Sequence, residues 1–135
     1  MIRGVSVQVI RDNAGASQYD AYIDGEVGGS LHYRIEGDRL LLLCTAVRPQ
    51  YRGLGLEDTL IRGALLDAHR RRLSVLPFCH QVCKRVFAHP VYLQLVPAED
   101  RQQFREYFEK IMKEEAWRWG KANKSAAPAP ATAAA

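Results

Sequence analysis

The sequence predicts a small α+β domain in which an antiparallel meander of strands leads into a β-α-β-α unit. Three observations support this prediction. Short alternating or apolar runs separated by turn residues occupy residues 5–47, an amphipathic helical pattern follows at 54–71, and an apolar run at 73–77 precedes a second helical pattern. A meander followed by one crossover helix is typical of α+β layer folds.

Four strands are expected before the first helix. Asp24-Gly25 is a hairpin signal between the second and third of them. The fourth strand contains the continuous apolar run Leu40–Cys44, so we expect a central strand covered on both faces. The expected strands are Val5–Ile10, Tyr19–Ile23, Val27–Ile35 and Arg39–Val47, and turns are expected at Asp12–Gly15 and Glu36–Asp38.

Three helical segments are expected after the meander. In the first, Leu54–Arg71, four apolar residues at a spacing of four lie along one face: Leu56, Leu60, Ala64 and Ala68. The second, His80–Ala88, should end before His89-Pro90, because proline disfavours helix in the residue that precedes it. A short helical turn is expected within Val91–Val96, after the buried strand Leu73–Pro77.

The chain changes character after Pro97. Residues 98–119 form a highly charged helical pattern with an apolar stripe, and beyond Gly120 the Ala/Pro-rich composition predicts disorder. We therefore divide the chain into a core domain at 1–97, an appended amphipathic helix at 98–120 and a disordered tail at 121–135. The stripe would either cover the core or form a homodimer or protein-partner surface. It comprises Phe104, Tyr107, Phe108, Ile111, Ala116 and Trp119.

Length and composition set the class of protein. A chain of 135 residues suits a single domain, and no run approaches the roughly 20 apolar residues of a membrane span. The start, Met1–Gly4, lacks the apolar region of a signal peptide, so we expect a cytoplasmic protein with no membrane partner. The odd cysteine count, three, argues against a disulfide framework.

Positive charge is concentrated in the middle of the chain. Residues 48–90 carry eight Lys/Arg against three acidic residues, whereas the whole chain has a net charge of +4. Such a field attracts phosphate-bearing ligands. Nucleic acid is an unlikely partner, because no Arg/Lys-rich helix with interleaved aromatic residues is present in this region.

A glycine-containing segment, Gln50-Tyr51-Arg52-Gly53-Leu54-Gly55, lies between the fourth strand and the first helix. Glycines at such a junction let backbone N–H groups approach an anion without interference from a Cβ atom. The segment is not a Walker A loop, because Leu56-Glu57 stands where Lys-Ser/Thr is required. It is not a dinucleotide fingerprint either, because position 58 is Asp.

Motifs across residues 5–97 resemble, in order and spacing, the compact subfamily of Gcn5-related N-acetyltransferases, whose members are little more than the acetyl-CoA-binding core. The residues that carry the resemblance are Tyr22-Ile23-Asp24-Gly25-Glu26, Gly28-Gly29-Ser30-Leu31-His32-Tyr33, Cys44-Thr45-Ala46-Val47-Arg48-Pro49, Arg52-Gly53-Leu54-Gly55, Pro77-Phe78-Cys79, His89-Pro90-Val91-Tyr92 and Leu95-Val96.

This resemblance implies an acetyl-CoA-dependent N-acetyltransferase acting on an amine, either a small molecule or a protein lysine. Backbone N–H groups from Gln50 to Glu57 would cradle the CoA pyrophosphate. The strand end from Thr45 to Val47 would hold the acetyl carbonyl, and Arg48 and Arg52 would contact phosphates. The implied cofactor-binding residues are Thr45, Val47, Arg48, Gln50, Tyr51, Arg52, Gly53, Leu54, Gly55 and Leu56.

Cys79 occupies the Pro-x-Cys position of the resemblance and is the candidate catalytic residue. It precedes a helix and adjoins His80, a setting that can activate a thiol as an acyl-accepting nucleophile. The alternative is a buried structural cysteine. Cys79, His80 and Cys83 within one helical turn lack a fourth zinc ligand at suitable spacing, so no metal is expected.

The chain also departs from these relatives. Glu57 stands where they usually carry a small residue, and Cys44 replaces a histidine. A carboxylate beside a pyrophosphate is unfavourable unless it points outward. The segment after Cys79 also departs from the relatives, at His80-Gln81 and Arg85. Glu57 and this altered segment motivate the alternative function, a non-catalytic acyl-CoA-binding module whose C-terminal helix docks a protein partner.

Overall fold

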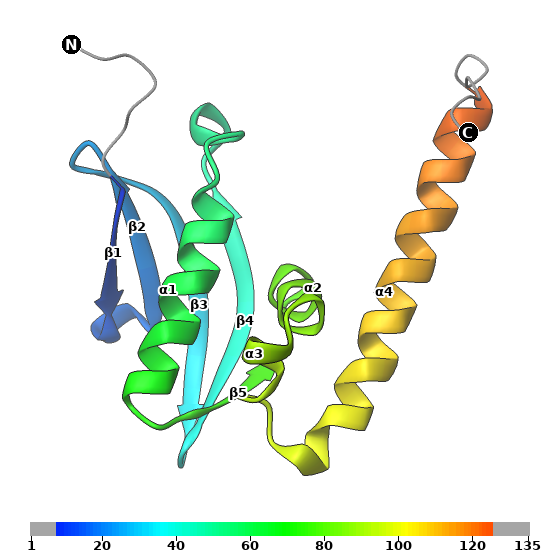
Figure 1. Ribbon diagram of the computed structural model, residues 1–135. Coiled ribbons are helices and arrows are strands. Elements are labelled where there is room, and N and C mark those ends of the chain that lie inside the picture. The colour runs from blue at the N-terminus through cyan, green and yellow to red at the C-terminus, as the bar shows by residue number, and fades with distance from the viewer. Residues whose placement is uncertain (1–7, 126–135) are drawn as a thin grey trace.

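The computed structural model describes residues 8–125 and has the predicted α+β architecture. Five strands form one sheet in the order β1-β2-β3-β4-β5, with antiparallel pairing through β4 and a parallel β4–β5 pair joined by helix α1 (Figure 1). The elements are β1 (Gln8–Asn13), β2 (Gln18–Ile23), β3 (Glu26–Glu36), β4 (Arg39–Val47), α1 (Leu56–Arg70), β5 (Ser74–Pro77), α2 (His80–Ala88), α3 (Pro90–Leu93) and α4 (Ala98–Ser125), with 3₁₀ turns η1 (Ala14–Ala16) and η2 (Pro49–Tyr51).

The bounds of β4 and α2 agree with the predictions. Strands β2, β3 and β5, the start of α3 and the end of α1 differ from them by one residue, and three larger differences remain. Strand β1 continues to Asn13, so the turn begins at Ala14, and residues 5–7 of the expected strand lie outside the described range. Helix α1 begins at Leu56 rather than at position 54. Helix α4 continues through Gly120 to Ser125, so part of the segment expected to be a disordered tail is helical, and the rest of it lies outside the described residues.

Helix α1 lies across one face of the sheet and supplies much of the core (Figure 1). The four residues predicted from their spacing, Leu56, Leu60, Ala64 and Ala68, are all buried, which confirms the prediction of the apolar face. A fully buried leucine contributes about 1.5–3 kcal/mol relative to an exposed one. This packing places the amino-terminal end of α1 over the carboxyl end of β4.

Strand β4 separates from β5 halfway along its length. The two strands pair only from Arg39↔Ser74 to Leu42↔Pro77, and the Cys79 N–H donates to the Leu42 carbonyl (2.9 Å) just past this pairing. Beyond Leu42, β4 pairs with β3 alone. The expectation that β4 is covered on both faces therefore holds for Leu40–Leu42 and is wrong for Leu43, which is 38% exposed, and for Cys44.

A β-bulge lies where the two strands separate. His32 pairs with Cys44 and Tyr33 with Leu42, so Leu43 is an extra residue on β4. A bulge bends its strand and increases the local twist. It accordingly turns the end of β4, residues 43–47, away from β5.

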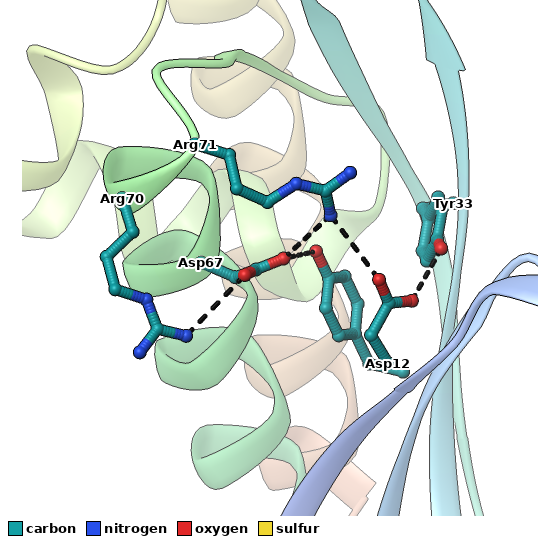
Figure 2. Close-up of polar contacts among 6 residues, drawn as sticks. Asp12, Tyr33, Asp67, Arg70 and Arg71 are labelled. Atoms are coloured by element: carbon teal, nitrogen blue, oxygen red, sulfur yellow. Dashed lines mark hydrogen bonds and ion pairs between the residues drawn. The ribbon is translucent and has the colours of Figure 1, made fainter.

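A network of polar side chains fastens the other end of α1 to the sheet (Figure 2). Tyr19 donates to Asp67 (2.7 Å), Arg71 binds both Asp67 (3.0 Å) and Asp12 (3.3 Å), and Tyr33 donates to Asp12 (2.5 Å). Although burial opposes it, the hydrogen bonds from Tyr19 and Arg71 hold the pKa of Asp67 below its ordinary value. Burial, followed by the bond to Asp12, raises the pKa of Tyr33 to about 12.

Helix α4 packs against α2 along only part of its length (Figure 1). Phe104 and Ile111 are buried, and Lys84 of α2 forms an ion pair with Glu115 (2.8 Å). Farther along the helix, Trp117 and Trp119 are exposed, as is Ala116 of the predicted apolar stripe. The first half of the stripe is thus a packing surface.

Candidate functional site: the loop between β4 and α1

The loop that joins β4 to α1 is shaped by two glycines in the left-handed backbone region. Gly53 has φ +85° and Gly55 has φ +78°. A Cβ atom added at either position would meet nothing within 4 Å, so the backbone conformation, and not crowding, requires glycine here. Such left-handed residues orient consecutive N–H groups toward one concave surface, a geometry that suits anions.

Four N–H groups of the loop and the first turn of α1, those of Gly53, Gly55, Leu56 and Glu57, donate to no backbone acceptor among residues 8–125. Helix α1 also has no side-chain cap at Gly55. The first N–H groups of a helix have no intrahelical partner, and the helix dipole adds partial positive charge there. The loop and the first turn of α1 can therefore bind a phosphate or pyrophosphate through the backbone.

Contacts with two strands, β1 and β3, hold the loop in place. A Cβ atom at Gly28 would lie 2.9 Å from Leu56 and 3.0 Å from Tyr51, so glycine allows the start of α1 to pack directly on β3. Gln8 of β1 donates to the Leu54 carbonyl (3.1 Å), and its amide oxygen accepts a bond from Thr59 (2.7 Å).

The hydroxyl of Tyr51 donates to Glu26 (2.8 Å), which ties the loop to the start of β3. The sequence predicts no site role for Gln8, and it marks Glu26 only as the last residue of the family-like segment Tyr22–Glu26. The roles of both residues depend on contacts with the loop that are distant in sequence.

A pocket of about 630 Å³ opens between this loop and the end of β4. It brings together seven of the ten predicted cofactor-binding residues. Arg48, Gln50 and Leu54 are exposed nearby but do not line it, whereas Ala46 and Glu57 do. The complete lining is Thr45, Ala46, Val47, Tyr51, Arg52, Gly53, Gly55, Leu56 and Glu57.

The end of β4 offers further backbone donors to this pocket. The Arg48 N–H donates to the Gly28 carbonyl on β3 (2.9 Å). Because N–H groups alternate in direction along a strand, those of Thr45 and Val47 point away from β3, toward the side where β5 no longer pairs. Thr45 and Val47 can thus donate to a ligand that lies along β4.

The charges around the pocket are mixed. Arg52 lines the pocket, and Arg48 lies next to it. Neither forms an ion pair with another residue of the described chain. Glu57 is the acidic residue of the lining, and its carboxylate accepts a hydrogen bond from the Thr45 hydroxyl (3.0 Å).

The three cysteines differ in environment. Cys79 is 6% exposed at the junction of β5 and α2 and does not line the pocket. Cys83 is buried and its Sγ lies 3.7 Å from the Phe104 carbonyl oxygen; burial raises its thiol pKa to about 12. Cys44 is exposed on β4. Among residues 8–125, no group of three or more His, Cys, Asp or Glu side chains could hold a metal ion.

A larger hollow of about 830 Å³ lies between α1 and α3. Its lining is mainly apolar, with Leu66 and Val91 exposed, and includes neither loop glycine. The loop pocket is therefore the better candidate for a phosphate-bearing ligand. Within the described chain, no helix is long and apolar enough to span a membrane.

Two comparisons with known proteins bear on the family of the chain. A search of curated proteins found no match to the chain. A family profile described as GCN5-related N-acetyl-transferase matches residues 18–95, which is more than half of the chain and includes β2 to β5, the glycine loop and α2. The chain therefore belongs to the GCN5-related N-acetyltransferase family.

Proposed function

We propose that the protein binds acetyl-CoA in the loop pocket and transfers the acetyl group to an amine. The observation that carries this proposal is the set of four N–H groups without backbone acceptors, those of Gly53, Gly55, Leu56 and Glu57, on residues that line the pocket. A pyrophosphate would satisfy several of these donors. Arg52 in the lining, and Arg48 beside it, would add charge-assisted contacts to phosphate oxygens.

The end of β4 would position the reacting group. In this proposal the N–H groups of Thr45 and Val47 bind the amide and thioester carbonyls of the pantetheine arm, because the pairing with β5 ends at Leu42 and leaves this edge open. A backbone donor at the thioester oxygen would stabilise the negative charge that develops when an amine attacks. Holding both reactants in line supplies the rest of the acceleration.

Direct attack by the neutral amine is the simpler route, and transfer through an acetyl-cysteine at Cys79 is the alternative. In the alternative, the Cys79 thiolate displaces CoA from the acetyl group, and the amine then displaces the thiolate. The burial of Cys79 and its absence from the pocket lining favour direct attack. Cys79→Ser separates the routes: it should keep most transfer activity if attack is direct and abolish it if the thiol is acetylated.

A non-catalytic acyl-CoA-binding module is the second candidate function. The exposed side chains of Met112, Trp117 and Trp119 on the outer half of α4 favour it, because such a helix can contact a partner protein. In this case the pocket would bind CoA without turnover.

Calorimetry with acetyl-CoA and CoA, followed by acetyl-transfer assays on a panel of small amines and lysine peptides, distinguishes the two functions. We expect binding of both ligands and transfer to at least one class of amine. Binding without transfer to any amine would favour the module. Absence of binding to either ligand would overturn both functions.

A further inference from the structure

Two carboxylates lie in the first turn of α1, and they point in different directions. Asp58 forms an ion pair with Arg85 of α2 and does not line the loop pocket. Glu57 is half-buried, lines the pocket and accepts the hydrogen bond from the Thr45 hydroxyl on β4 (3.0 Å). Of these two charges, only that of Glu57 faces the space beside the free N–H groups.

The charge of Glu57 is not cancelled by a cation. It forms no ion pair with any other described residue, and its hydrogen-bond donor, Thr45, is neutral. The Thr45 bond holds the carboxylate between β4 and α1, beside the backbone donors that an anionic ligand would use. A phosphate bound there would gain the N–H bonds and experience repulsion from Glu57.

We propose that Glu57 is a specificity-determining residue that weakens the binding of phosphate groups to this loop; this inference rests on the proposed function. Ligands that offer only phosphates, such as nucleoside diphosphates, then bind poorly. A ligand that also places a pantetheine arm along Thr45 and Val47 gains contacts that the carboxylate does not oppose. Selectivity for CoA over nucleotides thus comes from the arm.

Glu57→Gln tests the charge with little change in shape, because the Gln carbonyl can still accept the Thr45 hydrogen bond. Calorimetry would use three probes: CoA, ADP and the uncharged fragment pantetheine. Removing one like charge beside a phosphate at a protein surface should tighten binding about ten-fold. We expect this gain for CoA and ADP, no change for pantetheine, and a smaller gain at high salt.

Asp58→Asn is the matched control, because it removes the same charge from the same helical turn at a residue outside the pocket lining. Its affinity for CoA should stay within about two-fold of the wild type, because exposed charges away from the ligand are screened. Thermal unfolding of both variants verifies that they are folded.

Each result has a defined meaning. If the wild type binds CoA and Glu57→Gln does not bind it more tightly, the inference is wrong and the proposed function stands. An equal gain in CoA affinity in Asp58→Asn would also overturn it, because the effect of charge would then not be specific to Glu57. A gain in pantetheine affinity in Glu57→Gln would overturn it as well, because pantetheine carries no phosphate. If neither the wild type nor Glu57→Gln binds CoA, the proposed function itself fails.

Discussion

The hydroxyl of Tyr19 on β2 donates a 2.7 Å hydrogen bond to the carboxylate of Asp67 in the last turns of α1. Tyr19 is 2% exposed, so its hydroxyl has little access to water as an alternative partner. Arg71 binds the same carboxylate (3.0 Å). These contacts anchor the carboxyl-terminal end of α1 to the sheet, at the end of the helix opposite to the glycine loop.

Asp67→Asn should destabilise the protein by about 1–3 kcal/mol, because it weakens the bonds of a buried hydroxyl and a guanidinium. Urea unfolding at neutral pH measures this loss. Arg70→Gln is the control: the Arg70–Asp67 ion pair (3.5 Å) is exposed on the arginine side, so its loss should cost no more than about 1 kcal/mol.

The stability difference between wild type and Asp67→Asn should depend on pH in the acid range. Because the folded-state pKa of Asp67 is lowered, its contribution is complete above the ordinary pKa of 3.8 and is lost as the pH falls through the lower folded value. Urea midpoints of the two proteins should therefore converge below about pH 4. A difference that stays constant down to pH 2 would contradict this assignment.

The raised pKa of Tyr33 predicts a loss of folding stability at alkaline pH. Its pKa is raised from 10.0 to about 12 by burial and by its bond to Asp12. A raised tyrosine pKa stabilises the fold fully below pH 10, and this contribution is lost as the pH rises through 12. Absorbance at the tyrosinate band should show one ionisation near pH 12 that disappears in Tyr33→Phe; its persistence in that variant would assign it to another tyrosine.

Gly53→Ala and Gly55→Ala should each weaken CoA binding about ten-fold or more while leaving the fold intact. Both positions have positive φ, where a Cβ atom costs roughly 1–2 kcal/mol and favours a rearranged loop. Gly120→Ala is the matched control, because it lies within α4, where alanine is the better helix former. It should keep wild-type affinity and raise the thermal midpoint slightly.

The three thiols should differ in reactivity toward a disulfide reagent such as DTNB. Cys44 is exposed and should react fast in the native protein. Cys83 is buried and its pKa is raised to about 12, so very little reactive thiolate forms at neutral pH. We expect one fast thiol, lost in Cys44→Ser, with the others released only by denaturant. A fast phase that survives in Cys44→Ser would contradict this.

Phe104 and Trp117 should make very different contributions to stability, although both are aromatic residues of α4. Phe104 is 3% exposed and contacts Phe78 edge-on (5.2 Å), so Phe104→Ala should cost about 3–5 kcal/mol. Trp117 is 64% exposed, and Trp117→Ala should stay within about 0.5 kcal/mol. Chemical denaturation measures the free energy of unfolding of both variants. A large loss of stability in Trp117→Ala would indicate that Trp117 is buried in an interface in solution.

Much of the fold was predictable because the spacing of hydrophobic residues determines which segments form strands and which faces of helices are buried. The continuous apolar run predicted β4 with its correct bounds, and residues spaced by four predicted the buried face of α1. The bulge at Leu43 was not predictable, because it lies inside an apolar run with no turn residue to mark it. Gly120 suggested a helix end, but the Lys and Ala residues that follow are good helix formers and α4 continues to Ser125.

The candidate site was predictable where it depends on local sequence. Gly53 and Gly55 have a left-handed backbone conformation just before the first residue of α1. Two glycines at this spacing, directly before an amphipathic helical pattern, predicted this loop. The Thr45–Glu57 hydrogen bond was not predictable, because it depends on how closely α1 approaches β4. The position of Cys79 outside the pocket lining depends in the same way on where α2 packs.

Gln8 has a consequence for the motions of the molecule. It lies on β1, which pairs only with β2 and is therefore an edge strand, and its side chain bridges Leu54 and Thr59 on the two sides of the loop glycine Gly55. Edge strands open at lower free energy than central ones. Each opening of β1 at Gln8 breaks the hydrogen bonds from Gln8 to the loop. A ligand that orders the loop should therefore slow this opening. Amide hydrogen exchange in β1 would then report ligand binding, although β1 lies outside the pocket.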